Sequence, residues 1–271
     1  MTFDFRQRVA VVTGAVRGVG RAIVSEFVAA GASVVAADRD PDGLQETCGP
    51  HGDAVLAVCA DVRTLEGAKA IVSAATQKFG GLDFCINNAA VAPHTALLEE
   101  RAETWDAVYA VNCRGTFLMT QQAARVLIEL GHGGRIVNFS SGVSSRGSAG
   151  AAAYASSRAA TESFSRVAAI ELAPHDILVN CVSPGLIDTQ PKPLPPSMAA
   201  SLQQRIPKLP LARAGRSDEV ARVVLWLCSD ASSYVTGSVH HVDGAAQVGS
   251  RSTEPVVDED IRYDWVTGRS R

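Results

Sequence analysis

The sequence has no long hydrophobic run, no closely spaced pair of cysteines and no strong excess of one charge. A net charge of -3 gives no reason to expect nucleic acid as a partner. The six cysteines form no Cys-x-x-Cys motif, which favours reduced, buried thiols over a metal site or disulfides. The N-terminal sequence is MTFDFRQRVAVVTG, in which charged residues are followed by only a short apolar run. We therefore expect neither a signal peptide nor a membrane span. These features favour a cytoplasmic protein with a small-molecule ligand.

Short runs rich in β-branched residues alternate with segments of helical spacing along the chain. Because the runs lack polar alternation, they suit strands that are covered on both faces. The pattern predicts an α/β fold with a doubly wound, Rossmann-like parallel sheet of about seven strands. The strand candidates are RVAVVTG, SVVAAD, AVLAVCAD, LDFCINN, RIVNFSS, ILVNCVS and GSVHHVDG.

One domain is expected over residues 1–248, since no repeat or break in composition marks a second. It includes a substrate loop at 186–212, whose proline-rich part, 190–210, is either a lid or pocket wall or a plain surface loop. Residues 249–271 form a charged C-terminal extension. This extension either lies loosely on the surface or, because it contains Trp265, packs across a subunit boundary or over a pocket mouth.

A glycine-rich turn, VVTGAVRGVG, follows the first strand and precedes the first helix. Gly14, Gly18 and Gly20 allow a sharp turn, and a helix that begins near Gly18 presents free N–H groups to a pyrophosphate. Asp38 ends the next strand, where a carboxylate accepts hydrogen bonds from both hydroxyls of an adenosine ribose and repels a 2′-phosphate. We therefore expect NAD in preference to NADP, although the guanidinium of Arg39 could still meet a phosphate.

Several motifs together resemble those of the short-chain dehydrogenases/reductases. TGAVRGVG is similar to the family's TGxxxGxG turn, CADV to its adenine contact, and NNAA to its NNAG strand end. VNCRG resembles the helix with its catalytic asparagine, SPGLIDT its loop beside the nicotinamide, and YVTGSVHHVDGA its last strand. The resemblance covers residues 8–246 and implies a homodimer or homotetramer joined through two long helices near residues 101–130 and 151–173.

The resemblance also implies which residues bind the cofactor. They come from the glycine turn, from the ends of successive strands and from the loop beside the nicotinamide. They are Gly14, Arg17, Gly18, Val19, Gly20, Asp38, Arg39, Asp61, Val62, Asn88, Ala89, Ala90, Val111, Tyr154, Arg158, Pro184, Gly185, Ile187 and Thr189.

The catalytic set implied by the resemblance is Asn112, Ser141, Tyr154 and Arg158. Ser140 and Ser141 both follow a strand, but the family's serine lies thirteen residues before its tyrosine, which selects Ser141. Ser141 would hydrogen-bond the substrate oxygen. In this family the asparagine bends its helix and retains a water that connects a lysine to solvent, and Arg158 stands in place of that lysine.

Tyr154 and Arg158 are four residues apart, so on a helix they share one face. Hydride transfer from a carbinol carbon leaves the hydroxyl proton for a second group to accept. A fixed cation one turn from a phenol favours the phenolate, which is the form that accepts a proton. Arginine keeps its charge at every accessible pH but cannot lose a proton, so it closes any relay through an ammonium group.

Two positions admit alternative interpretations. Ala90 stands where the family has glycine. If the glycine provides a positive φ, alanine destabilises the fold by about 1 kcal/mol. If the glycine is needed only for a close approach to the cofactor, the added methyl group is tolerated. Arg158 could instead form a surface ion pair with Glu162, which is four residues further along the chain.

Two functions therefore remain open. The first is an NAD-dependent oxidoreductase, or ketoreductase, that interconverts a secondary alcohol and a ketone. Val143, Leu186, Pro93 and His94 suggest an apolar pocket and hence a lipophilic or cyclic small molecule as substrate. The second is an NAD-binding protein of the same fold whose catalysis is impaired or altered because Arg158 replaces the lysine. Such a protein would be either a non-catalytic subunit or the enzyme of a different pathway reaction.

Overall fold

Seven parallel strands form the central sheet of the computed structural model, which describes residues 3–189 and 196–250. The strand order is β3-β2-β1-β4-β5-β6-β9, and every neighbouring pair is parallel. This confirms the predicted doubly wound α/β fold. The strands are β1 (Val9–Thr13), β2 (Ser33–Asp38), β3 (Val55–Cys59), β4 (Phe84–Asn87), β5 (Gly134–Phe139), β6 (Ile177–Pro184) and β9 (Val239–Val242).

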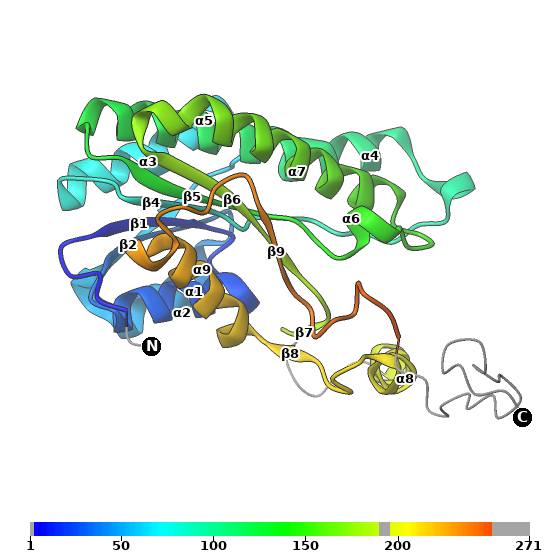
Figure 1. Cartoon of the computed structure of the whole chain (residues 1–271). Coiled ribbons are helices and arrows are strands. Elements are labelled where there is room, and N and C mark those ends of the chain that lie inside the picture. Colours follow the sequence, from blue (N-terminus) through cyan, green and yellow to red (C-terminus); the bar gives the residue numbers. More distant parts are fainter. Residues whose placement is uncertain (1–2, 190–195, 251–271) are drawn as a thin grey trace, which may run out of the picture.

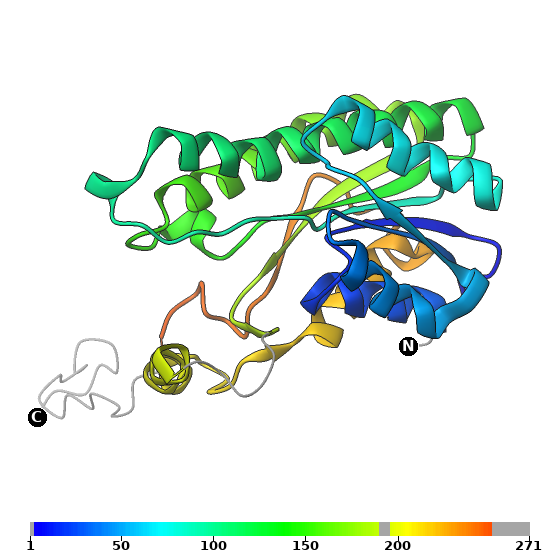
Figure 2. The ribbon, with the colours of Figure 1, turned by 180° about the vertical axis from the view of Figure 1, so that it is seen from behind.

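Helices cover both faces of the sheet (Figure 1; Figure 2). On one face lie α1 (Gly18–Ala29), α2 (Pro41–Cys48) and α9 (Ser217–Cys228). The other face carries α3 (Leu65–Phe79), α4 (Ala102–Tyr109), α5 (Thr116–Leu130) and α7 (Ala152–Leu172). Two further helices, α6 (Val143–Arg146) and α8 (Pro196–Arg205), lie beyond the carboxyl ends of the strands. Short 3-10 helices span Gly49–Ala54, Leu97–Glu99, Ala173–His175, Ile206–Lys208 and Asp230–Ser232, and a π-helical turn spans Ala110–Gly115.

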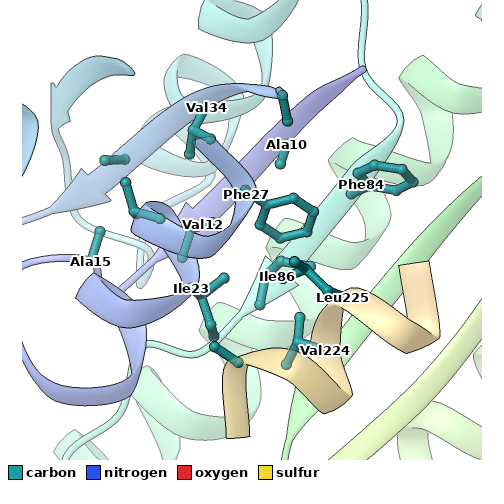
Figure 3. Packing of buried hydrophobic residues seen from close by; sticks show 14 of the residues in the cluster. Ala10, Val12, Ala15, Ile23, Phe27, Val34, Phe84, Ile86, Val224 and Leu225 are labelled. Carbon is teal, nitrogen blue, oxygen red and sulfur yellow. The ribbon is translucent and has the colours of Figure 1, made fainter. Parts of the chain in front are cut away.

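Alternate side chains of each central strand enter two separate hydrophobic cores. Ala10 and Val12 of β1 face the core under α1 and α9, whereas Val11 faces the core under α3 and α5. Figure 3 shows Phe27 of α1 and Leu225 of α9 gathered against the first face. This two-sided burial explains why the strands read as continuous apolar runs.

Helix ends follow from local side-chain chemistry. The hydroxyl of Thr64 accepts the N–H of Gly67 at 2.9 Å and so caps the first turn of α3. Gly80, at φ 80°, and Gly131, at φ 72°, end α3 and α5 in the left-handed conformation that glycine adopts without strain. These caps define both ends of α3 and the C-terminal end of α5, two of the helices that cover one face of the sheet.

The predicted substrate loop contains regular structure that the sequence analysis did not anticipate. β7 (Ile187–Asp188) pairs in parallel with β8 (Gly215–Arg216), and the described part of the proline-rich segment forms α8. The interpretation of 190–210 as a plain surface loop is therefore wrong for its described part. Residues 190–195 and 251–271 lie outside the described residues, so the predicted packing of the C-terminal extension stays a prediction.

The cysteines correct one expectation. Cys48, Cys85, Cys181 and Cys228 are buried as predicted, but Cys113 is half-buried and Cys59 is exposed. Cys59 ends β3 at the outer edge of the sheet, which leaves its side chain open to solvent. Within residues 3–189 and 196–250, no helix combines the length and the apolar character needed to cross a membrane.

Candidate active site

The glycine turn joins β1 to α1 at the carboxyl edge of the sheet. Gly14 and Gly18 have φ values of 66° and 54°, and a Cβ atom at Gly20 would lie 2.0 Å from the carbonyl oxygen of Gly14. Arg17 occupies the N-cap position of α1 without a side-chain cap, and the first turn contains no acidic residue. The first N–H groups of α1 are therefore left for an external anion such as a phosphate.

Asp38 lies half-buried at the end of β2. Its Oδ1 accepts the backbone N–H groups of Arg39 at 2.7 Å and Asp40 at 3.3 Å, while its Oδ2 has no hydrogen bond to a described residue. The guanidinium of Arg39 is 3.9 Å from the carboxylate of Asp61. The carboxylate of Asp38 thus retains an acceptor for a hydroxyl, and Arg39 is partly neutralised by a different acid.

The residues predicted to contact the adenine end lie at the same edge of the sheet. Asp61 accepts hydrogen bonds from the guanidinium of Arg63 at 2.6 and 2.8 Å, and this hydrogen bonding lowers the pKa of Asp61. Val62 lines a small hollow together with Ala89 and Val111. The structure therefore brings these predicted residues together, with the Asp61 carboxylate bound to Arg63.

The end of β4 is tied to the glycine turn. The amide nitrogen of the Asn88 side chain donates to the carbonyls of Thr13 and Gly14, both at 3.0 Å, and the Ala89 N–H donates to the Thr13 hydroxyl at 3.1 Å. Ala90 is not among the described non-glycine residues with a positive φ. The strain considered for Ala90 is therefore absent, and the effect of the substitution is limited to one methyl group in the wall of the cavity.

A cavity of 370 Å³ lies beyond the carboxyl ends of the strands. Its wall combines most of the predicted nicotinamide-side residues with three of the four predicted catalytic residues. They are Val19, Asn88, Ala90, Ser141, Tyr154, Arg158, Pro184, Gly185, Ile187 and Thr189.

Tyr154 and Arg158 share one face of α7, and the Cζ of Arg158 is 5.3 Å from the centre of the Tyr154 ring. Burial raises the pKa of Tyr154, while the positive charge of Arg158 and hydrogen bonds with Ser141 and Arg158 lower it. The lowering prevails, so the pKa of Tyr154 falls below its ordinary value. The site thus favours the phenolate that a proton acceptor requires.

Arg158 is 2% exposed, and its Nη1 donates to the carbonyl of Phe139 at 2.7 Å. The alternative of a surface ion pair with Glu162 is therefore wrong. Glu162 instead accepts the hydroxyls of Ser140 at 2.5 Å and Ser144 at 2.6 Å, so the hydroxyl of Ser140 is already bonded to a carboxylate. The Nε of Arg158 is buried without a partner among the described residues, and an unmatched buried donor costs about 1–3 kcal/mol.

Asn112 lies in the π-helical turn Ala110–Gly115, in agreement with the bend that the resemblance implies. Its Oδ1 accepts the Val91 N–H and its Nδ2 donates to the Val91 carbonyl, both at 3.0 Å. The backbone carbonyl of Asn112 accepts the hydroxyls of Thr116 at 2.8 Å and Thr161 at 3.3 Å. The backbone carbonyl of Asn112 thus already accepts two hydroxyls, whereas its Oδ1 accepts one N–H and keeps a second lone pair.

The predicted apolar pocket is correct only in part. Val143 and Leu186 line the cavity, whereas Pro93 and His94 do not. The segment that carries Pro93 and His94 runs past the cavity, and the N–H of Thr95 two residues later bonds to the carbonyl of Gly150 at 2.8 Å.

Arg146, Arg205 and Leu209 also line the cavity, although no sequence motif marked them. The Nη1 of Arg146 donates to the carbonyl of Ala246 at 3.1 Å, so the chain after β9 holds the end of α6 in place. The three residues come from two separate segments, since Arg146 ends α6 whereas Arg205 and Leu209 both belong to the predicted substrate loop. The length of that loop was a signal for Arg205 and Leu209, and no spacing in the sequence relates them to Arg146.

Comparison with known proteins agrees with this fold and site. The family model described as enoyl-(acyl carrier protein) reductase matches residues 14–246. The 3-oxoacyl-[acyl-carrier-protein] reductase of Aquifex aeolicus is 35% identical over 253 residues, which cover 90% of this chain and 99% of that protein. The L-xylulose reductase of Bos taurus is 38% identical over 240 residues, or 88% and 95% of the two chains. The solved structure of a short-chain type dehydrogenase/reductase from Mycobacterium marinum has a TM-score of 0.83 at 34% identity and covers 90% of this chain and 97% of its own.

The fold, the glycine turn and the tyrosine-lined cavity define a Rossmann-type oxidoreductase that uses a nicotinamide cofactor. Within this class, the chain belongs to the short-chain dehydrogenase/reductase family.

Proposed function

We propose that the chain is an NAD-dependent oxidoreductase that interconverts a secondary alcohol and a ketone. The observation that carries the proposal is the position of Tyr154, which lies between Ser141 and Arg158 in a cavity that reaches the predicted cofactor residues. The bound nicotinamide supplies the hydride acceptor or donor, so that alcohol and NAD⁺ give ketone, NADH and one proton.

Each catalytic side chain has a separate task. Tyr154 accepts the hydroxyl proton during oxidation and returns it during reduction. Ser141 hydrogen-bonds the reacting oxygen and orients it toward Tyr154. Arg158 supplies a permanent positive charge that stabilises the phenolate, and it takes no part in the proton transfer because a guanidinium stays protonated.

NAD is the cofactor that we propose, on the evidence of Asp38. Its Oδ2 has no hydrogen bond to a described residue and is available to the hydroxyls of a ribose. A 2′-phosphate at this position would face a carboxylate. Arg39, the cation that could offset this repulsion, lies 3.9 Å from Asp61.

The substrate that we propose has a lipophilic body. Val143, Leu186 and Leu209 supply apolar surface on the substrate side of the cavity. The relatives named as 3-oxoacyl-[acyl-carrier-protein] reductase and L-xylulose reductase are both reductases, which supports alcohol and ketone chemistry for this chain as well. We place this reaction in the cytoplasm.

We also propose a homodimer or homotetramer that buries the outer faces of α5 and α7. These helices run side by side in both views (Figure 1; Figure 2). A groove of 570 Å³ beside them is lined by the rings of Tyr109, Phe117 and Phe164, and its lining also includes Asp106 and Arg114. Ile170 on the same stretch of α7 is 75% exposed, so a large apolar area is left for a second copy to cover.

One observation favours the alternative of an NAD-binding protein without this catalysis. The guanidinium of Arg158 is anchored to the Phe139 carbonyl and leaves its Nε unmatched, which indicates an imperfect fit of arginine to the site. We nevertheless favour the active enzyme, because the charge of Arg158 still acts on Tyr154.

Replacing Tyr154 with phenylalanine tests the proposal. The variant keeps the ring that packs against Arg158 but has no group to accept the proton, so we expect turnover to fall by roughly 10²–10⁴. Turnover is measured as NADH absorbance with a panel of secondary alcohols, and NAD affinity is measured by fluorescence titration as the control. Equal turnover by both proteins would contradict the assignment, and NAD binding without turnover by the unaltered protein would favour the alternative.

A further inference from the structure

The charge of the cavity wall goes beyond what the proposed reaction requires. Three arginines line the cavity, namely Arg146, Arg158 and Arg205, while none of its lining residues within the described chain is aspartate or glutamate. Only Arg158 has a role in the proposed chemistry. The two remaining guanidinium groups give the substrate side of the cavity a positive charge that no lining carboxylate balances.

Arg146 and Arg205 differ from Arg158 in their surroundings. Arg158 is buried and bonded to Phe139, whereas the other two arginines are exposed. Neither forms an ion pair with a residue of the described chain. Arg146 has one hydrogen bond, to the carbonyl of Ala246, and Arg205 has none to a described residue. A guanidinium carries five N–H donors, so both groups keep donors for a ligand.

The two arginines reach the cavity from separate elements. Arg146 is the last residue of α6 and follows Ser141 closely in the chain, whereas Arg205 is the last residue of α8. Both figures show α6 beside α7, while α8 lies apart from it near β7 and β8 (Figure 1; Figure 2). Both side chains line one cavity, and they belong to two elements that lie apart in the fold.

We infer that the cavity selects alcohols or ketones that carry an anionic group, a carboxylate or a phosphate, and that Arg146 and Arg205 bind this group. The inference rests on the proposed function. Planar guanidinium groups bind carboxylate and phosphate oxygens through paired, charge-assisted hydrogen bonds. The apolar wall at Val143 and Leu186 would hold the carbon chain between this group and the hydroxyl that faces Tyr154. The cofactor's pyrophosphate has its own site at the uncapped start of α1.

Calorimetric titration of the full chain saturated with NADH, which cannot accept a hydride from the alcohol probes, tests this inference without turnover. The probes are hydroxypentanoates with the hydroxyl on the second, third or fourth carbon, each paired with its uncharged methyl ester, and glycerol phosphate paired with glycerol. At least one acid of the series is expected to bind about 10- to 100-fold more tightly than its neutral partner. Selectivity within the carboxylate pairs or within the phosphate pair identifies which anion the site takes.

The variants Arg146→Gln and Arg205→Gln remove one charge each. Each is expected to weaken binding of the selected acid by about 10- to 100-fold while leaving the neutral partner and NAD unaffected. Arg222→Gln removes an equivalent charge from α9, outside the cavity, and should change neither affinity. Arg205→Lys keeps the charge but loses the paired geometry, so it should retain only part of the preference.

Equal or tighter binding of every neutral partner, or failure of every anionic probe to bind, overturns the inference. A loss of NAD affinity in Arg205→Gln that matches the loss of acid affinity also overturns it, because that result assigns the arginine to the cofactor. Turnover of neutral alcohols without a preference for acids leaves the proposed oxidoreductase intact and refutes only the anion site. Selective acid binding without turnover of any alcohol refutes the proposed function and retains the anion site.

Discussion

Replacing Arg158 with glutamine removes the charge that faces Tyr154 and keeps an amide donor in its place. The Cζ of Arg158 lies 5.3 Å from the centre of the Tyr154 ring. If the separation from the phenolate oxygen is of the same order, about 5 Å, two unit charges interact by about 3 kcal/mol at an effective dielectric constant of about 20. This energy stabilises the phenolate of Tyr154 and is lost in the variant. Oxidation of an alcohol at neutral pH should therefore slow by roughly 100-fold, because the phenolate is the form that accepts the proton.

The pH dependence of the rate shows in which direction Arg158 shifts the pKa of Tyr154. The charge of Arg158 and the hydrogen bonds of Ser141 lower the pKa of Tyr154, against the opposing effect of burial. Oxidation should rise with pH until the pKa of Tyr154 is passed, and reduction, which needs the phenol, should fall over the same range. Without the charge the pKa of Tyr154 rises, so both inflections should move to higher pH in Arg158→Gln.

The assay follows initial rates of NADH formation against pH for the unaltered protein, Arg158→Gln and Arg158→Lys. Lysine restores a charge and should keep the inflection below that of the glutamine variant. Arg166→Gln removes a charge from an exposed position on the same helix and serves as the control. An unchanged inflection and rate in Arg158→Gln, with NAD affinity intact, would refute the role of the guanidinium as the source of the charge.

Two further substitutions test the cofactor and the assembly. Asp38→Ala removes the carboxylate that favours a ribose hydroxyl over a phosphate. The ratio of kcat/KM for NAD to kcat/KM for NADP should therefore fall by roughly 10- to 100-fold. An unchanged ratio would count against Asp38 as the residue that determines cofactor preference. Phe117→Glu places a charge in the groove beside α5 and α7, so sedimentation velocity should show a smaller species. Leu98→Glu, at a side chain that is 98% exposed, is the control, and an unchanged size for both variants would contradict the proposed interface.

The inner strands of the main sheet were predictable because two-sided burial gives them largely apolar runs. The edge strand β9 contains two histidines and is not fully buried, so it was predicted from its motif rather than from an apolar run. The same rule has no application to β7 and β8, which contain two residues each and are too short to show a period. α8 was missed because a proline-rich segment suggests a loop. Pro196, however, is the first residue of α8, where its missing N–H leaves no helical hydrogen bond unmade.

The candidate site was predictable where its residues belong to motifs with fixed spacing. Ser141, Tyr154 and Arg158 follow each other at short intervals, and the structure places all three in one cavity. The environment of Arg158 was not predictable, because Phe139 and Glu162 acquire their partners only when β5 packs against α7. For the same reason the sequence contained no sign that arginines of α6 and α8 share one cavity.

The hydrogen bonds of Asn112 bear on the route of the proton in the proposed oxidation. The backbone carbonyl of Asn112 accepts the hydroxyls of Thr116 and Thr161, and the guanidinium of Arg158 stays protonated. A relay that passes from Tyr154 through Arg158 is therefore closed. If the proposed enzyme releases its proton through the opening that admits the substrate, a bound substrate would slow the exchange of that proton with water.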